Sequence, residues 1–533
     1  MTKRIGIVFY LFVLCTGALG LRLMRIPYTL PAQSSHGASR VVVDSSRGAI
    51  YDRNGVWLVQ GRRQAYAAVR PTPAASLALR GVLSEGRFAA AEERLARGSL
   101  IALPVDPPVP PCPDILLLDA WPRYAVNQLA VHVIGYLDGQ SGAGVSGIEK
   151  AFEPILGGAA GELSVRMAAD VHGRGLAGAA LEVQNDNYRS RAGVRLTIDA
   201  RVQRIAQEAL ALCGVEQGAA VVLDCRTGEI LALASTPAFD PNRIAQSLDD
   251  PLEPFFNRAL GAWPMGSSFK CFIAAAALEQ RFPASTVFDC AGELDVSGQV
   301  YHCSGGIVHG PADMSRALEL SCNLYFIQLA QQMQLQPMLD LLRLFGFGEG
   351  VKLAPGIHGA DGIMPAQEEL ALPGELANFS FGQGRLLGTP LQLAAATACL
   401  ANGGVYRSPT LVMATVDETG AATPYAQDRE LREVISPEIA AQVREMMIAT
   451  VETGTASGAK PETGGAGGKT ATAQSGRPGR DGTELLQTGF MGFFPAQEPR
   501  YAVAVLRENG TSGAEDCAPV FKRIADAMTA IGM

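Results

Sequence analysis

The stretch Pro264–Lys270 restricts the fold of this chain more than any other part of the sequence. It runs directly into residues 271–280, which are rich in strong helix formers, so it predicts a helix with its N-terminus at or near Ser267. Residues three apart share a helix face, which brings the ammonium group of Lys270 within reach of the Ser267 hydroxyl. Positive potential at the helix N-terminus favours an alkoxide, and a buried lysine that loses its proton can serve as the base. The pattern indicates a serine nucleophile; a serine N-cap beside a solvated lysine is the alternative.

An uncharged, mostly apolar run follows the basic pair Lys3 and Arg4 and extends from Ile5 to Leu21. As a helix this run is just long enough to cross a bilayer, and the basic residues before it predict that the rest of the chain lies outside the cytoplasm. We therefore expect residues 1–25 to be a single-pass anchor in the cell membrane with a short cytoplasmic N-terminus. A cleaved signal peptide is the alternative, and in both cases the chemistry takes place on the extracytoplasmic side.

The length of 533 residues is too great for one domain and suggests two or three. Residues 40–193 form a first domain of mixed character, with extended stretches, an alanine-rich helical segment and a proline cluster. Because they offer no nucleophile paired with a base, we interpret them as a scaffold or spacer. The second domain begins near residue 194 and includes a predicted β-hairpin, residues 219–224 and 229–234, in the centre of a sheet. The net charge of -8 argues against a nucleic-acid partner.

Two more polar clusters follow the serine and lysine pair. Ser321 and Asn323 lie in a short segment in which a hydroxyl can pass a proton and an amide can hold a substrate amide; a helix cap is the alternative. Much later, the glycine-rich residues 464–468 lead into residues 469–474, which have strand character. A lysine and two hydroxyl groups along one strand edge can bind a carboxylate, and the backbone N–H groups of the strand can complete an oxyanion hole.

Most of the ten cysteines look like isolated small core residues. The exception is the pair Cys290 and Cys303, which has His309 nearby. An exported chain permits a disulfide between the two cysteines, and a disulfide or a plain loop is the interpretation that we favour. A zinc site formed by Cys290, Cys303 and His309 is the alternative, because thiolates and imidazole suit that metal.

Three motifs, in this order and at these separations, resemble those of penicillin-binding proteins and serine β-lactamases. They are Ser267-x-x-Lys270, Ser321-x-Asn323 and Lys469-Thr470-Ala471. Other stretches resemble the class B, monofunctional transpeptidases, so that the resemblance covers nearly the whole chain. These stretches are Arg47–Gly55, Gly147–Lys150, Asn257–Ala259, and Phe381–Gly384 followed by Thr389–Ala394.

The resemblance implies a protein of the α+β class with an N-terminal transmembrane helix over residues 1–25. It also implies a mixed pedestal domain of the dimerisation type over residues 40–193, and a transpeptidase domain over residues 194–533 in which helices flank an antiparallel sheet. The segment before the last domain is too short, and lacks the matching motif, for the glycosyltransferase of bifunctional relatives. A membrane glycosyltransferase is an expected partner, and no cofactor is expected.

In function, the resemblance implies a peptidoglycan D,D-transpeptidase that cross-links stem peptides. Ser267 would attack the carbonyl between the two terminal D-alanines, release D-alanine and hold the rest as an acyl-enzyme, which an amine from a neighbouring stem would then take. Lys270 would be the base for acylation, Ser321 would relay a proton towards the leaving amine, and Asn323 would orient the peptide. β-Lactams mimic the two D-alanines and would be trapped at Ser267.

The third motif would bind the terminal carboxylate through Lys469, Thr470 and Thr472, while the backbone N–H groups of Ser267 and Thr472 would form the oxyanion hole. Family members usually have glycine where this chain has Ala471, and glycine lets a ligand approach the strand closely. We expect the methyl group to crowd the substrate or alter β-lactam affinity without abolishing activity. The remaining alternatives are a D,D-carboxypeptidase or β-lactamase-like hydrolase, and a non-catalytic penicillin-binding scaffold or sensor.

Overall fold

The computed structural model describes residues 6, 10, 12–21, 38–170, 179–427, 429–478, 482 and 484–533. Much of the predicted membrane anchor, residues 1–25, lies outside this described part; residues 12–21 of it are helical. Among the described helices, none combines the length and the apolar character that crossing a membrane requires. The transmembrane helix therefore stays a prediction.

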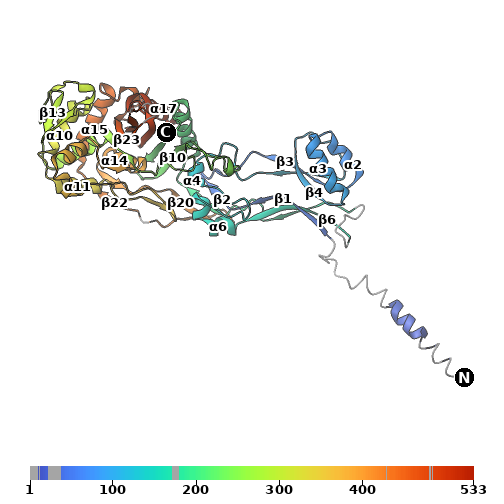
Figure 1. The fold of residues 1–533 in the computed structure, drawn as a ribbon. Helices are drawn as coiled ribbons and strands as arrows, with labels where there is room; N and C mark the ends of the chain where they lie inside the picture. Colours follow the sequence, from blue (N-terminus) through green and yellow to red (C-terminus); the bar gives the residue numbers. More distant parts are fainter. Residues whose placement is uncertain are drawn as a thin grey trace. The chain divides into compact units, whose positions relative to one another are not determined.

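Packing divides the chain into two compact units whose segments alternate along the sequence (Figure 1). Unit 1 comprises residues 1–46, 62–122 and 161–188, and unit 2 comprises residues 47–61, 123–160 and 189–533. The residues of the predicted pedestal, 40–193, are thus shared between the two units. One sheet shows why: β2 (Ala49–Tyr51) pairs with β8 (Gly193–Leu196), which pairs with β20 (Val412–Val416). The domain boundary at residue 193 itself stays a prediction.

Unit 1 contains two antiparallel sheets of three strands each. The first has the order β1-β6-β7, with β1 at Ala38–Ser46, β6 at Gly161–Ala168 and β7 at Glu182–Asp186. The second has the order β4-β3-β5, with β4 at Ile101–Val105, β3 at Gln64–Val69 and β5 at Ile115–Ala120. The helices α2 (Pro73–Arg80) and α3 (Glu85–Ala96) bury Leu79 and Leu95 against the second sheet.

The core of unit 2 is a five-stranded antiparallel sheet with the order β10-β9-β25-β24-β23. Its strands are β9 at Gly218–Asp224, β10 at Ile230–Thr236, β23 at Gly467–Pro478, β24 at Glu484–Phe494 and β25 at Tyr501–Gly510. Successive side chains of a strand point to opposite faces, and both faces here are apolar. Val222 lies in the apolar cluster of one face and Val221 in the cluster of the other.

Helices cover both faces of this sheet. The helices α7 (Ala200–Leu212) and α17 (Ala518–Ala530) pack on one face, and α8 (Lys270–Glu279), α14 (Pro390–Ala401) and α15 (Pro437–Glu452) pack on the other. Asp199 caps the N-terminus of α7, because its side chain accepts a hydrogen bond from the N–H of Arg201 at 2.9 Å. The predicted antiparallel sheet flanked by helices is confirmed.

The predicted hairpin exists as β9 and β10, but it lies at one end of the sheet rather than in its centre. Although β10 is an edge strand, its residues from Ile230 to Ser235 are buried. Since helices cover both faces of the sheet, an edge strand and an internal strand carry the same apolar pattern here. The sequence pattern therefore predicted the burial of the hairpin correctly and its position wrongly.

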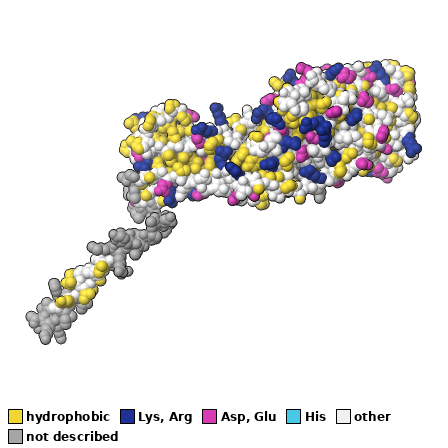
Figure 2. All heavy atoms as spheres, turned by 180° about the vertical axis from the view of Figure 1, so that it is seen from behind, with side chains coloured by type: hydrophobic (Ala, Val, Ile, Leu, Met, Phe, Trp, Pro, Cys, Tyr) yellow, Lys and Arg dark blue, Asp and Glu magenta, His cyan; other side chains and the backbone are white. Residues whose placement is uncertain are grey.

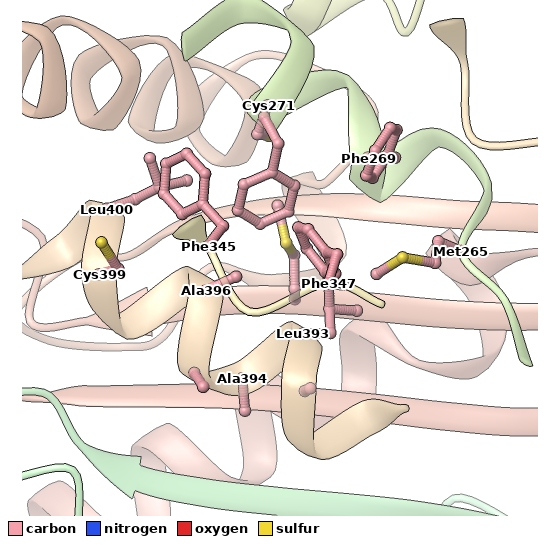
Figure 3. Close-up of a cluster of buried hydrophobic side chains, with 14 of the residues drawn as sticks. Met265, Phe269, Cys271, Phe345, Phe347, Leu393, Ala394, Ala396, Cys399 and Leu400 are labelled. Atoms are coloured by element: carbon pink, nitrogen blue, oxygen red, sulfur yellow. The ribbon is translucent and has the colours of Figure 1, made fainter. Parts of the chain in front are cut away.

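Helix α8 lies within the larger apolar cluster, and every residue from Lys270 to Leu278 is buried. Phe269, the residue directly before α8, packs against other aromatic rings. The ring centroid of Phe269 lies 5.5 Å from that of Phe347 and 5.2 Å from that of Phe379. Figure 3 shows Phe269, Phe347 and Met265 in this cluster. The turn that precedes α8 therefore rests on a packed apolar support.

Candidate active site

A short turn carries Ser267 in front of α8. Residues Gly266–Phe269 form the 3₁₀ turn η2, and α8 begins at Lys270, so the predicted helix start is confirmed. Ser268 is buried, and its hydroxyl donates to the carbonyl of Met265 at 2.7 Å. Ser267 is only partly buried, so its hydroxyl is the one in this turn that a ligand can reach.

The side chain of Lys270 is completely buried among uncharged hydrogen-bond acceptors. Its Nζ donates to Ser267 Oγ at 3.0 Å, to Asn323 Oδ1 at 2.6 Å and to the Ser321 carbonyl at 2.7 Å. Burial, and after it the positive charge of Lys469, lower the pKa of Lys270 to about 7. A lysine with this pKa is partly neutral at pH 7, and its neutral form can accept the Ser267 proton.

Ser321 and Asn323 come from the turn between α9 (Met314–Glu319) and α10 (Asn323–Ala330). Ser321 has a left-handed backbone conformation with φ of 57°, which is uncommon for a residue other than glycine and is concentrated at functional sites. Its Oγ accepts a hydrogen bond from the Nζ of Lys270 at 3.3 Å and from the Nζ of Lys469 at 2.9 Å. A hydroxyl shared by two amines is well placed to pass a proton.

Lys469 lies on β23, which is the edge strand at the opposite end of the sheet from β10. Its side chain is completely buried, and this burial lowers the pKa of Lys469 to about 8. The Nζ also contacts the Thr470 carbonyl at 3.1 Å and the Thr470 hydroxyl at 3.3 Å. With this pKa the ammonium group stays mostly protonated at pH 7, and it presents a positive charge to an anionic ligand.

Ala471 and Thr472 have other surroundings. Thr472 is exposed, and its Oγ1 accepts a hydrogen bond from the Gly513 N–H at 3.1 Å. Ala471 is 5% exposed, and a Cβ atom added to Gly266 or to Gly489 would lie 3.4 or 3.6 Å from its methyl carbon. The methyl group is thus packed between the turn before Ser267 and strand β24. Whether this methyl also crowds a substrate stays a prediction.

Six of the eight predicted site residues meet in one hydrogen-bonded network, although they come from three separate parts of the chain. They are Ser267, Lys270, Ser321, Asn323, Lys469 and Thr470. Thr472 and Ala471 lie on the same strand, but within the described residues their side chains form no hydrogen bond with the other six. The roles of the eight residues in catalysis and binding stay predictions at this point.

A cluster of three cysteines and a histidine adjoins the Ser321–Asn323 turn. It contains the predicted residues Cys290, Cys303 and His309, and it adds Cys322, which the sequence interpretation missed. The His309 Nδ1 atom lies 3.4 Å from the Sγ atoms of both Cys290 and Cys303, and the Sγ atoms of Cys303 and Cys322 are 3.8 Å apart. The spacing of 19 residues between Cys303 and Cys322 matches no short metal-binding motif. Cys322 could therefore be recognised as a member of the cluster only from the folded structure.

A family model for the penicillin binding protein transpeptidase domain matches residues 218–526. The chain belongs to the penicillin-binding protein transpeptidase family. This penicillin-binding protein is 33% identical to the peptidoglycan D,D-transpeptidase MrdA of Acinetobacter baumannii, over 75% of its own length and 65% of the relative's. It is 30% identical to stage V sporulation protein D of Bacillus subtilis, over 73% and 60%. The chain thus spans less than two thirds of the length of these two relatives.

Other relatives match over more of their length. The peptidoglycan D,D-transpeptidase PbpA of Mycobacterium tuberculosis is 30% identical over 71% of this penicillin-binding protein and 79% of PbpA. The structure of penicillin-binding protein A from M. tuberculosis as an imipenem acyl-enzyme complex gives a TM-score of 0.65 at 25% identity, covering 91% of this chain and 98% of that one. A chain of a peptidoglycan synthase complex gives a TM-score of 0.69 at 25% identity, covering 100% and 99%. The predicted resemblance to class B penicillin-binding proteins and the α+β fold are confirmed.

Proposed function

We propose that this penicillin-binding protein is a peptidoglycan D,D-transpeptidase that cross-links stem peptides through an acyl-enzyme on Ser267. The observation that carries this proposal is the 3.0 Å hydrogen bond between Ser267 Oγ and the Nζ of the completely buried Lys270. A neutral amine at that distance can take the hydroxyl proton as the oxygen attacks a carbonyl carbon. The names of the relatives from A. baumannii and M. tuberculosis state the same activity for those proteins.

In the acylation step, neutral Lys270 accepts the proton of Ser267 while Oγ bonds to the carbonyl carbon of the penultimate D-alanine. The backbone N–H groups of Ser267 and Thr472 stabilise the oxyanion of the tetrahedral intermediate. The peptide bond then breaks, and the leaving nitrogen of D-alanine receives a proton through Ser321, whose hydroxyl contacts both lysines. In the second step an amine of another stem peptide attacks the acyl-enzyme, its proton passes back to the protein, and Ser267 leaves as a free hydroxyl.

Binding of the substrate depends on Lys469 and its neighbours. The ammonium group of Lys469 is fixed by Ser321 Oγ at 2.9 Å and by the Thr470 carbonyl, so it is oriented before a ligand arrives. With the hydroxyl groups of Thr470 and Thr472 it binds the carboxylate of the terminal D-alanine. Asn323 donates to the His302 carbonyl at 3.4 Å and accepts from Lys270, which orients its amide toward the peptide. β-Lactams carry a carboxylate beside a reactive carbonyl, so the same groups bind them.

Two measurements test this proposal. Mass spectrometry of the purified chain after penicillin treatment should find one penicilloyl group, on the peptide that contains Ser267, and none on the Ser267→Ala variant. An unlabelled wild-type chain would favour the non-catalytic scaffold or sensor. Incubation with a stem-peptide donor and an acceptor amine should give the cross-linked dimer. If the donor is only hydrolysed, the D,D-carboxypeptidase or β-lactamase-like alternative replaces the transpeptidase.

We also propose that the chain is anchored in the cell membrane by residues 1–25, with its catalytic part on the extracytoplasmic side and a membrane glycosyltransferase as partner. The basic residues Lys3 and Arg4 before an apolar run support the anchor and its orientation. The similar peptidoglycan synthase complex coordinates polymerization and crosslinking. A nucleic-acid partner is not proposed: the net charge is -8, and the face in Figure 2 intersperses basic with acidic side chains. Protease accessibility of the full chain in sealed spheroplasts tests the orientation.

For the cysteine cluster we propose a Zn²⁺ site with the ligands Cys290, Cys303, His309 and Cys322. A tetrahedral zinc ion with Zn–S bonds of about 2.3 Å and a Zn–N bond of about 2.1 Å separates its sulfur ligands by about 3.8 Å, and sulfur from nitrogen by about 3.6 Å. The observed separations of 3.8 Å between two Sγ atoms and 3.4 Å from Sγ to Nδ1 are close to both values. Hydrogen bonds from Cys322 and from the Asn323 N–H lower the pKa of Cys303, which favours its thiolate, whereas the same contact raises the pKa of Cys322, so metal binding would have to displace the Cys322 proton.

Metal analysis of the purified chain tests the zinc site. We expect about one zinc per chain, and replacement by Co²⁺ should give the intense visible absorption of tetrahedral thiolate coordination. The Cys290→Ser variant should lose both signals. A chain without metal, with two fewer titratable thiols than cysteines, would instead support the disulfide between Cys290 and Cys303.

A further inference from the structure

The segment before the nucleophile is bonded to a second loop at both of its ends. Strand β11 (Trp263–Pro264) pairs with β18 (Leu387–Gly388), and the N–H of Gly266 donates to the carbonyl of Gly382 at 2.9 Å. Both Gly266 and Gly382 are buried. The loop that contains Gly382 is therefore a direct support of the turn that carries Ser267.

The approach of Gly382 to this turn is too close for any side chain. A Cβ atom on Gly382 would lie 1.9 Å from the Gly266 carbonyl oxygen and 2.6 Å from its carbonyl carbon. The φ of Gly382 is +82°, which also favours glycine. On the opposite side, a Cβ atom on Gly266 would lie 3.4 Å from the methyl of Ala471 and 3.3 Å from that of Ala473. The Gly266 peptide is thus held between Gly382 and strand β23.

This contact bears on the reaction because of peptide geometry. The carbonyl of Gly266 and the N–H of Ser267 belong to one planar peptide group, so a change in the direction of the carbonyl turns the N–H with it. That N–H is one of the two donors in the proposed oxyanion hole. Donors of this kind act only when they point at the place where the oxyanion forms.

We infer that Gly382 is a positioning residue for the oxyanion hole: by direct backbone contact it fixes the plane of the Gly266–Ser267 peptide. This inference rests on the proposed transpeptidase function. According to this inference, residue 382 must lack a side chain for rapid acylation, and not only for the folding of the loop. Gly382 does not touch the reacting atoms and acts through Gly266.

The test compares Gly382→Ala with Gly384→Ala in the full chain. Gly384 also has a positive φ, +76°, but it is exposed, and a Cβ there would lie 3.3 Å from the Cβ of Asn378, away from the Ser267 turn. Loss of one oxyanion donor lowers acylation about 100-fold to 1000-fold, and we expect a loss of that size in Gly382→Ala. We expect the Gly384→Ala rate to stay within about threefold of wild type, because its added methyl group does not reach the turn.

Four readouts separate positioning from a general structural effect. Stopped-flow acylation by a fluorescent penicillin should show a reduced acylation rate constant in Gly382→Ala, with an unchanged noncovalent dissociation constant and an unchanged fraction of folded chain. A boronic acid that forms a tetrahedral adduct with serine should lose affinity by a similar factor. A wild-type rate in Gly382→Ala, or an equal loss in Gly384→Ala, would overturn the inference.

A measurement on the wild-type chain covers the case in which Gly382→Ala does not fold. Deuterium exchange of the peptide that spans residues 262–268 reports on the Gly266 N–H. Strong protection is expected from its hydrogen bond to Gly382, and exchange at the rate of a free amide would contradict the inference. If the wild-type chain is not acylated by penicillin at all, the proposed function fails. The exchange measurement still tests the hydrogen bond between Gly266 and Gly382 independently of that function.

Discussion

Replacement of Lys469 by glutamine should move the pH dependence of acylation, because the two lysines of the site are electrostatically coupled. The Nζ atoms of Lys270 and Lys469 contact the same hydroxyl, Ser321 Oγ, at 3.3 and 2.9 Å. Burial is the larger cause of the low pKa of Lys270, about 7, and the positive charge of Lys469 is the next. The Lys469→Gln variant removes the second cause and leaves the first in place.

The size of the change follows from the distance. Two contacts to one oxygen place the ammonium groups at most about 6 Å apart, and unit charges at that distance repel by about 3 kcal/mol at an effective dielectric constant of about 20. That energy corresponds to a pKa shift of about 2 pH units. Because burial lowers the pKa of Lys270 more than the charge of Lys469 does, and burial is unchanged in the variant, we expect the pKa to rise by about 1 to 2 pH units. Only neutral Lys270 accepts the serine proton. Acylation by wild type should therefore rise with pH through about 7, and the rise in Lys469→Gln should occur at a higher pH.

Stopped-flow acylation by a fluorescent penicillin between about pH 5 and pH 10 measures this profile around the pKa of the base. Both Lys469→Gln and the charge-conserving Lys469→Arg should acylate more slowly, because Lys469 is also the proposed ligand of the substrate carboxylate. The informative quantity is therefore the pH of half-maximal rate, which should stay near that of wild type in Lys469→Arg. An identical midpoint in wild type and Lys469→Gln would refute the coupling between the two lysines.

Two further predictions concern stability and the third motif. Arg258 and Glu508 form a buried ion pair at 2.5 Å, so Glu508→Gln should lower the free energy of unfolding by about 3 kcal/mol in urea titration; an effect below about 1 kcal/mol would mean that the pair contributes no more than a surface pair. Ala471→Gly removes a buried methyl group and adds backbone freedom, so it should cost about 1 to 2 kcal/mol. Its acylation rate should change less than about threefold, because the methyl packs against the turn before Ser267 and against strand β24, and a tenfold rise would support the expectation that it crowds the substrate.

The sequence predicted the parts of the site that local rules control. A serine three residues before a lysine at a helix start must place the two side chains on one face, and the structure has Ser267 and Lys270 in that arrangement. The meeting of this pair with Ser321 and Lys469 depends on the packing of distant segments, and it was predicted from family resemblance rather than from the residues. Cys322 was missed for the same reason, because its partners are close only after folding.

The sequence also could not predict the direction of some side chains or the order of the strands in the sheet. Whether the Ala471 methyl points toward ligand or toward the interior depends on what packs against β23, which periodicity does not specify. The hairpin of β9 and β10 was assigned to the centre of the sheet because both strands are apolar, but helices on both faces give an edge strand the same composition. Likewise, the alternation of the two compact units along the chain depends on contacts between distant segments, which the sequence pattern does not specify.

The shared hydroxyl of Ser321 has a consequence for the direction of proton delivery. A serine oxygen has two lone pairs and one hydrogen. When both ammonium groups donate to it, as the contacts at 3.3 and 2.9 Å allow, both lone pairs are occupied. In that arrangement the single hydrogen of Ser321 points away from the two lysines, so the hydroxyl can donate it to a third group such as a departing amine.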